Sequence, residues 1–335
     1  MANVVLHIGT HKTATTTVQD TFYHNRALLA DHGIIYPALG LHTGHHGLLT
    51  DWIALPAAYR LPRGGLGTLR ALAAEYVDSN KTLFLSSEEF SRGGGTGGQV
   101  DMAVLRQVFE GYESIRVICT LREQWQFLQS VYLELARSRI PDRPPVLIET
   151  AIRTGMVDGL WCDYRALYDH LLTGFSPETI RFVDFNAACE SPGGVLGTML
   201  SILELPFGAE ALEPINNGVS NASALALPSW AGFTIAGGHT FGPDLFSIVQ
   251  TAFDIEYGQN AKSCLFTRKE LELISDRYTQ LNAELAGRVA PFQPEFSISE
   301  KHPEEDTVYR EDIGASFWLR AARRIYLSSR DVELS

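Results

Sequence analysis

The sequence lacks the features that define several classes of protein. Its 335 residues include only four cysteines, Cys119, Cys162, Cys189 and Cys264, and none are spaced as CxxC. We therefore expect neither a zinc site nor a disulfide framework. Basic residues are also in deficit, because 27 Lys and Arg stand against 39 Asp and Glu, a formal net charge of −12. Proteins that bind nucleic acid along its backbone normally have a basic surplus, so we expect no nucleic-acid partner.

Long apolar runs are missing as well. No segment approaches the ~20 apolar residues that a membrane-spanning helix requires, so we expect no integral membrane segment. The first residues, MANVVLHIG, lead directly into a strand pattern and leave no room for a secretory signal. These features predict a cytoplasmic protein, with peripheral contact to a membrane left open.

What the chain does have is an alternation of strand and helix patterns within an ordinary globular composition, 45% hydrophobic and 20% charged. Apolar runs predict strands near residues 3–8, 34–37, 82–86, 115–121 and 179–184. We therefore predict an α/β fold, a P-loop-type parallel sheet of about five strands flanked by helices. Helical and loop insertions would form the substrate side.

The helical segments follow the same alternation. Helical patterns cover about 15–31, 66–79, 100–111, 122–139, 146–155, 159–173, 193–205, 243–254, 267–288 and 313–328, and the chain from about residue 213 to the helix at 243 reads as loop. No linker separates independent domains. We expect one domain over 1–335, with a core over about 1–205 and a mainly helical extension over about 206–335.

An anion-binding loop is predicted between the first strand and the first helix, in HIGTHKTATTTVQ (residues 7–19). Such a loop presents unpaired backbone N–H groups and the positive end of the helix dipole. Lys12 adds a charge, and hydroxyls come from Thr13, Thr15, Thr16 and Thr17. The ATP-binding pattern GxxxxGK[ST] does not fit, because Gly9 is only three residues before Lys12 and His11 directly precedes the lysine.

A second basic stretch follows the fourth strand, in ICTLREQWQFLQSVY (residues 118–132). Arg122 stands at the end of the strand, and Ser130 comes eight residues later. The arginine fork can hold a phosphate at two points. Ser130 lies about two helical turns farther on, so both side chains are expected near one groove.

These two stretches, in this order, resemble the motifs of sulfotransferases that use 3′-phosphoadenosine 5′-phosphosulfate (PAPS). That family's loop reads approximately PKTGTTxLQ or HKTGTTSxQ, and the sequence THKTATTTVQ matches it at its lysine, three of its threonines and Gln19. Ala14 replaces the usual glycine. We expect helical or extended backbone at Ala14, where alanine is tolerated. The family's second motif, an arginine with a serine eight residues later, is matched by Arg122 and Ser130.

The resemblance implies a bound nucleotide and no metal. PAPS, with the desulfated nucleotide PAP as product, would be held by His11, Lys12, Thr13, Ala14, Thr15, Thr16, Thr17, Arg122 and Ser130. A sulfuryl group has one negative charge, so Lys12 and helix N–H groups can replace a metal ion. The resemblance covers roughly residues 4–185 in scattered blocks. The family's downstream RKGxxG loop is absent, and INNGVSNAS (215–223) is a candidate for its place.

An acceptor hydroxyl also requires a general base. Glu88 follows the third strand, where heparan-type sulfotransferases have a carboxylate base in a similar segment, and Glu89 should point the other way if the strand continues. His45 and His46 are competing candidates, because histidine titrates near neutrality. We expect Lys12, Glu88 and His46 to be catalytic, and His45, His46 and Glu88 to contact the substrate. The histidines lack a clear carboxylate partner for a metal.

The expected function is sulfuryl transfer from PAPS to a hydroxyl of a carbohydrate or glycoconjugate, as the resemblance to heparan-type and bacterial carbohydrate sulfotransferases implies. Candidates for holding an anionic sugar are Arg60, Arg63, Arg92 and Arg153, and candidates for stacking on one are Trp52 and Tyr59. A phenol, a lipid or another small metabolite is an alternative acceptor. Further alternatives are an ATP-dependent small-molecule kinase and a non-catalytic nucleotide-binding protein.

Overall fold

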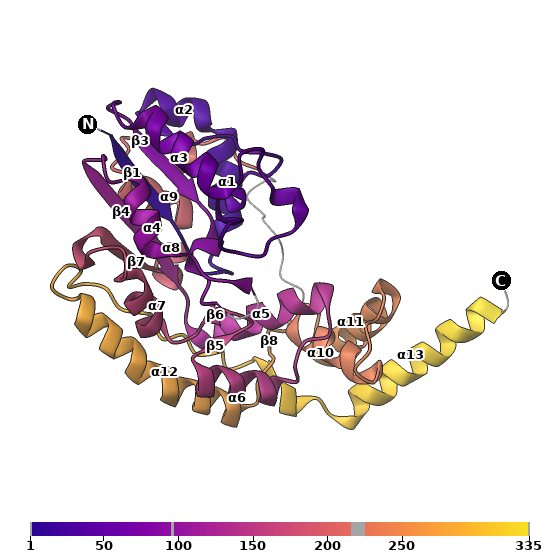
Figure 1. Cartoon of the computed structure of the whole chain (residues 1–335). Helices are drawn as coiled ribbons and strands as arrows, with labels where there is room; N and C mark the ends of the chain where they lie inside the picture. The colour runs from indigo at the N-terminus through magenta and orange to yellow at the C-terminus, as the bar shows by residue number, and fades with distance from the viewer. Residues whose placement is uncertain (1, 95–96, 216–224, 334–335) are drawn as a thin grey trace. The chain divides into compact units, whose positions relative to one another are not determined.

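The computed structural model describes residues 2–94, 97–215 and 225–333, with the backbone alone for residues 330–333 (Figure 1). The chain divides into two compact units. The first unit is Met1–Glu123, Ala151–Asn221 and Tyr278–Glu300, and the second is Gln124–Thr150, Ala222–Arg277 and Lys301–Ser335. The division expected from the sequence differs from these units, because residues 124–150 cluster with the later helices and residues 278–300 cluster with the first unit.

The first unit is built on a five-stranded parallel sheet with the strand order β2-β3-β1-β4-β7. Its strands are β1 (Asn3–His7), β2 (Ile34–Ile35), β3 (Thr82–Ser86), β4 (Ser114–Leu121) and β7 (Ile180–Asp184). The predicted α/β fold and parallel sheet are therefore confirmed. Because β1 lies in the centre, its carboxyl end is flanked by the ends of β3 and β4.

Helices cover both faces of this sheet, and two hydrophobic cores fill the space between the layers (Figure 1). Side chains alternate along β1, so Val4 and Leu6 enter one core and Val5 enters the other. The first core packs against α3 (Gly65–Tyr76), α4 (Met102–Val108) and α7 (Tyr164–Leu171). The second packs against α1 (Thr15–His24), α2 (Arg26–Asp31), α8 (Phe185–Glu190) and α9 (Gly194–Ile202).

The first predicted helix is in fact two helices. It breaks at Asn25, whose side-chain amide donates to the Thr21 carbonyl at 2.8 Å and whose Oδ1 accepts from the Glu213 backbone N–H at 2.8 Å. An asparagine side chain that competes for helix carbonyls in this way favours a helix end. The prediction of one continuous helix over 15–31 was therefore wrong.

The helix expected over 159–173 begins later than predicted. A short antiparallel pair, β5 (Met156–Val157) and β6 (Leu160–Trp161), occupies its start, with Asp158 and Gly159 at positive φ in the turn. The helix α7 begins only at Tyr164, after the Asp163 side chain accepts from the Arg165 N–H at 3.0 Å. The Asp-Gly pair is a hairpin signal that the helical pattern obscured.

Short 3-10 turns complete the first unit. They are η1 (His46–Leu49), η2 (Ala57–Tyr59), η3 (Glu88–Ser91), η5 (Pro177–Thr179) and η6 (Ala209–Ala211). Of these, η1 and η3 follow or adjoin the strand ends where the candidate site lies.

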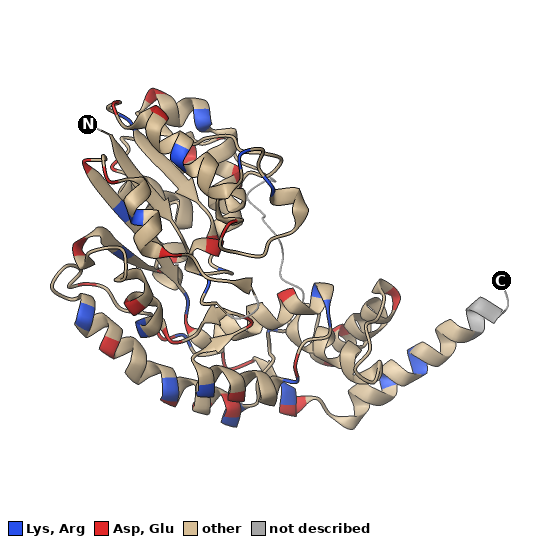
Figure 2. Cartoon of the chain, viewed as in Figure 1, with Lys and Arg blue, Asp and Glu red and all other residues tan. Residues whose placement is uncertain are grey.

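The second unit is mainly helical. It contains α5 (Gln124–Ser138), the first turns of α6 (Pro144–Thr154), α10 (Ala226–Ile235), α11 (Pro243–Tyr257), the start of α12 (Arg268–Val289), β8 (Ser263–Cys264), β9 (Val308–Tyr309), η8 (Arg310–Asp312) and α13 (Ala315–Glu333). Residues of both charge signs occur along α12 (Figure 2). The helix α10 was expected to be loop. Residues 216–223 of the INNGVSNAS segment lie outside the described residues.

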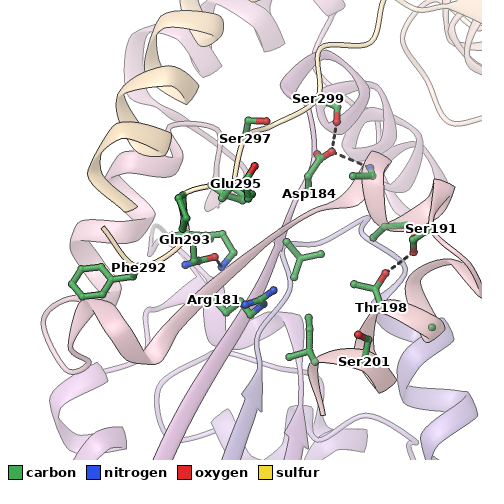
Figure 3. A pocket seen from close by; sticks show the side chains of 18 of the residues that line it. Arg181, Asp184, Ser191, Thr198, Ser201, Phe292, Gln293, Glu295, Ser297 and Ser299 are labelled. Carbon is green, nitrogen blue, oxygen red and sulfur yellow. Dashed lines mark hydrogen bonds between the residues drawn. The ribbon is translucent and has the colours of Figure 1, made fainter. Parts of the chain in front are cut away.

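A cavity of about 740 Å³ opens along β7, one of the two edge strands of the sheet (Figure 3). Gln293 covers part of this edge, because its Oε1 accepts from the Phe182 N–H at 2.9 Å and its Nε2 donates to the Ile180 carbonyl at 2.8 Å. The amide thereby replaces two backbone groups of a neighbouring strand. Ser299 donates to Asp184 at the end of the strand. No residue of the loop over 7–19 lines this cavity.

Candidate functional site

The loop between β1 and α1 is bent by two residues in the left-handed region. Lys12 has φ 65°, and Ala14, which immediately precedes α1, has φ 60° and ψ 26°. The expectation of helical or extended backbone at Ala14 was therefore wrong. Left-handed backbone costs a residue with a Cβ roughly 1–2 kcal/mol, so other contacts must hold this loop in place.

Hydrogen bonds from β4 and η3 hold the loop. The Thr10 N–H donates to the Thr120 carbonyl at 2.9 Å, and the Thr13 hydroxyl donates to the Thr10 carbonyl at 2.6 Å. On the other side, the Ser91 hydroxyl donates to the Gly9 carbonyl at 3.0 Å. A Cβ added at Gly9 would lie 2.6 Å from Thr15 Cγ2, so the packing requires glycine there. The loop is thus fixed to the strand ends before any ligand arrives.

The loop delivers the chain to the positive end of α1. No side chain caps this helix, and its first turn contains no acidic residue. Its first backbone hydrogen bond runs from the Val18 N–H to the Ala14 carbonyl at 3.2 Å. An N-terminus of this kind, next to Lys12, is suited to an anion.

Arg122 meets the same loop from the end of β4. Its Nη1 donates to the Lys12 carbonyl at 3.1 Å, and its guanidinium lies 4.8 Å from the centre of the Phe185 ring. The Tyr164 hydroxyl donates to the Arg122 carbonyl at 2.5 Å. Burial lowers the pKa of Arg122 from its ordinary value, and the guanidinium stays cationic at neutral pH. The loop and Arg122 therefore meet within the first unit.

Ser130 lies on α5, in the second unit, and its side chain is buried. Its pairing with Arg122 around one phosphate stays a prediction.

Glu88 lies on η3, beyond the end of β3. Its Oε2 accepts from Gln19 Nε2 at 2.9 Å and lies 3.9 Å from His46 Nδ1. Burial by itself raises the pKa of Glu88, but the nearby His46 and His11, the backbone and Gln19 together lower it. This carboxylate therefore stays ionised at neutral pH.

Glu89 also faces the site, which the sequence did not predict. The strand β3 ends at Ser86 and the chain turns into η3, so the alternation of a strand no longer applies. Glu89 Oε1 lies 3.3 Å from His11 Nε2, and Oε2 lies 3.3 Å from Arg92 Nε. Burial raises the pKa of Glu89, and the hydrogen bond and charge of His11, with Arg92 and His46, lower it further than burial raises it.

His46 lies beside Glu88, and one of its ring nitrogens contacts a serine hydroxyl. Its Nδ1 lies 2.8 Å from Ser87 Oγ. A Cβ added at Gly44 would lie 2.8 Å from His46 Nε2 and 2.5 Å from Gln19 Oε1, so the histidine and the glutamine pack against a glycine backbone. The ring of Tyr59 lies 5.2 Å from that of His46 in an edge-on arrangement.

His45 is in a different environment from its neighbour. Its side chain is buried, Nε2 lies 2.8 Å from the Pro37 carbonyl, and Nδ1 accepts from the Ser86 N–H at 2.8 Å. Burial lowers its pKa to about 4. Both ring nitrogens are engaged, which leaves none for a substrate or a proton. His45 is therefore left out of the acceptor site that we propose below, and its expected contact with the substrate stays a prediction.

Three residues at the site were missed by the sequence reasoning or given no role: Gln19, Ser87 and His7. Gln19 follows Thr15 by four residues on α1, and this spacing alone places it on the same helix face as the loop. His7 is buried at the end of β1, with Nδ1 2.8 Å from Ser86 Oγ, and burial lowers its pKa to about 4. No sequence pattern marked His7 or Ser87, because their contacts join residues far apart in the chain.

Comparison with known proteins gives limited information. No family model matches the sequence, and no curated protein matches it. Among solved structures, the chain is similar to a crystal structure of a sulfotransferase from Alicyclobacillus acidocaldarius, with 15% identity and a TM-score of 0.40. The match covers 70% of this chain and 91% of that chain. At this level the likeness carries no argument about activity.

In the part of the chain that the structure describes, no group of three His, Cys, Asp or Glu side chains could hold a metal ion. No described helix is both long enough and apolar enough to cross a bilayer.

Replacing Ala14 by glycine should stabilise the protein by about 1 kcal/mol, because glycine adopts the left-handed region without the steric penalty of a Cβ. Chemical denaturation of the two proteins measures this difference. Ala74→Gly, at an exposed position inside α3, is the matched control and should destabilise by about 1 kcal/mol. Equal destabilisation by both substitutions would show that the Ala14 backbone carries no strain.

The protein should lose stability as the pH falls from 6.5 toward 4. His7 and His45 have folded-state pKa values of about 4 against an ordinary value of 6.5, so the unfolded chain binds protons first. Their contribution is complete above pH 6.5 and falls by roughly 3 kcal/mol for each histidine across this window. Denaturation at several pH values should give a flatter dependence for His7→Gln than for the wild type. An unchanged pH dependence in His7→Gln, like that expected for the exposed control His24→Gln, would contradict this account.

Proposed function

We propose that this protein transfers a sulfuryl group from PAPS to an acceptor hydroxyl. One observation carries the proposal: Lys12, the uncapped start of α1 and Arg122 meet at the carboxyl ends of the strands. These are positively charged groups in an otherwise acidic chain, whose net charge is −12. Their convergence supports a ligand with more than one anionic group.

The residues present fit such a nucleotide. Alternating left-handed residues at Lys12 and Ala14 belong to the kind of backbone that turns successive N–H groups toward an anion. In the proposal, His11, Lys12, Thr13, Ala14, Thr15, Thr16 and Thr17 hold the 5′ end of the nucleotide. Arg122 holds the 3′-phosphate, which distinguishes PAPS from ATP. When bound, PAPS supplies the sulfuryl group, and Lys12 neutralises charge on the departing phosphate.

His46 is the residue that we assign to proton removal from the acceptor, with Glu88 as its partner. Glu88 is ionised, accepts a hydrogen bond from Gln19 and lies 3.9 Å from His46 Nδ1. Because its pKa is lowered, Glu88 is itself a weaker base, and we assign proton removal to His46 instead. The contact between His46 Nδ1 and Ser87 Oγ fixes the ring, so Nε2 is the nitrogen that we assign to removing the proton of the acceptor hydroxyl.

A carbohydrate or glycoconjugate is the acceptor class that we propose. Tyr59 supports it, because its ring lies beside His46 and, at 4.3 Å between ring centres, beside His42. An aromatic ring next to the base offers a stacking surface for a sugar. A phenol, lipid or other small metabolite is the alternative, and would use the same aromatic surface. Arg92, a candidate for holding an anionic sugar, forms an ion pair with Glu89.

Two other functions make different predictions. A small-molecule kinase would require Mg²⁺ with ATP, and the loop lacks the GxxxxGK[ST] pattern. A non-catalytic nucleotide-binding protein would bind PAP but would transfer sulfate to no acceptor. The ionised Glu88 beside His46 favours catalysis over simple binding.

Micromolar PAP should raise the melting temperature of the protein, and ATP with Mg²⁺ should not, because Arg122 is assigned to the 3′-phosphate. Lys12→Ala should abolish this shift, since it removes the cation of the loop. Lys269→Ala, on the exposed surface of α12, is the matched control and should keep the full shift. Stabilisation by ATP but not by PAP would overturn the proposed function.

His46→Asn should lower the rate of sulfate transfer by at least about 100-fold and remove the acidic limb of the pH–rate profile. Glu88→Gln should reduce the rate less, because the histidine remains. Transfer from PAPS to a panel of glycans and phenols, followed at pH 5 to 9, measures both effects. His32→Asn, remote at the end of α2, should behave as the wild type. A greater loss in Glu88→Gln, with the pH profile of His46→Asn unchanged, would make Glu88 the base.

A further inference from the structure

The helix α13 (Ala315–Glu333) presents two different faces. One face packs within the second unit, where Phe317 and Ala321 are fully buried in a core shared with α10 and α11. Its later turns extend beyond α11, its main packing partner (Figure 1). The helix is therefore anchored by its first turns.

On the opposite face of α13, large apolar side chains are unusually exposed to solvent. Leu319 is 72% exposed, Tyr326 59% and Leu327 53%. At about 100° per residue, these three and Arg323 fall within an arc of roughly 100°, directly opposite Phe317 and Ala321. Single exposed apolar residues are normal on a protein surface, whereas a helical stripe of them indicates a binding face.

The charge of this stretch is opposite to that of the chain. Residues 315–329 contain Arg320, Arg323 and Arg324 and no acidic residue, in a chain of net charge −12 (Figure 2). Arg320 forms an ion pair with Glu256 of α11 at 3.0 Å. No carboxylate among the described side chains pairs with Arg323 or Arg324.

We propose that this face of α13, formed by Leu319, Arg323, Tyr326 and Leu327, binds the surface of an anionic lipid bilayer. A helix with apolar side chains and arginines on its open side lies in the interface, with the apolar groups among the acyl chains and the cations at the headgroups. The remainder of the chain is acidic and would be repelled, so the contact is restricted to this helix. The proposal does not depend on the proposed function.

Charge favours lipid over a second copy of the chain. In a two-fold symmetric contact the same face meets itself, which brings the arginines of both copies together without acidic partners. An anionic bilayer offers many negative groups to the same arginines. Self-association through this face is therefore the main competing outcome of the test.

The test is flotation of the full chain with vesicles. The protein should float with vesicles of phosphatidylcholine and 30% phosphatidylserine, but not with phosphatidylcholine alone, and 0.5 M salt should weaken binding. Arg323→Gln should lower the partition coefficient by about fivefold. The triple variant Leu319→Gln, Tyr326→Gln, Leu327→Gln should abolish flotation.

Matched controls separate the face from general effects. Leu273→Gln, at an exposed position on α12, and Arg106→Gln, on α4, should float as the wild type does. Far-ultraviolet circular dichroism and melting temperature show that the variants remain folded. The proposal is overturned if the wild type does not float with anionic vesicles, or floats equally with both vesicle types. It is also overturned if the wild type elutes as a dimer that the α13 substitutions dissociate.

Discussion

The strained turn between β1 and α1 is the constraint on which the candidate site depends. Two residues with side chains, Lys12 and Ala14, are held in left-handed backbone by hydrogen bonds that join the loop to β4 and η3. This geometry brings the lysine to the start of an uncapped helix and puts its carbonyl against Arg122. The fold therefore supplies the free energy that keeps the loop ready for an anion.

Two carboxylates stand beside this loop, and they have different partners in the structure. Glu89 pairs with Arg92 and contacts His11, so its charge opposes a bound anion less. Glu88 turns instead toward Gln19 and His46. Because both glutamates lie on the 3-10 turn η3, their consecutive side chains reach different partners. One short segment thereby serves both the donor and the acceptor sides of the proposed reaction.

The sequence predicted the features that rest on local pattern. The parallel sheet followed from apolar runs, and the loop and Arg122 followed from residue types placed after strands. It failed where tertiary contacts override propensity: Ala14 in left-handed backbone, the helix end at Asn25, and Glu89 turned into the site. His45 and His46 are adjacent residues of the same type, so the sequence does not distinguish the structural histidine from the candidate base. Burial in the folded chain does.

The central claim is that this loop binds the 5′ end of a nucleotide whose 3′-phosphate meets Arg122. A crystal structure of the protein with PAP tests it most directly. We predict the 5′-phosphate within hydrogen-bonding distance of Lys12 and the first-turn N–H groups of α1, and the 3′-phosphate within that distance of Arg122. PAP bound in the cavity along β7, or bound with its phosphates away from Lys12 and Arg122, would contradict the account.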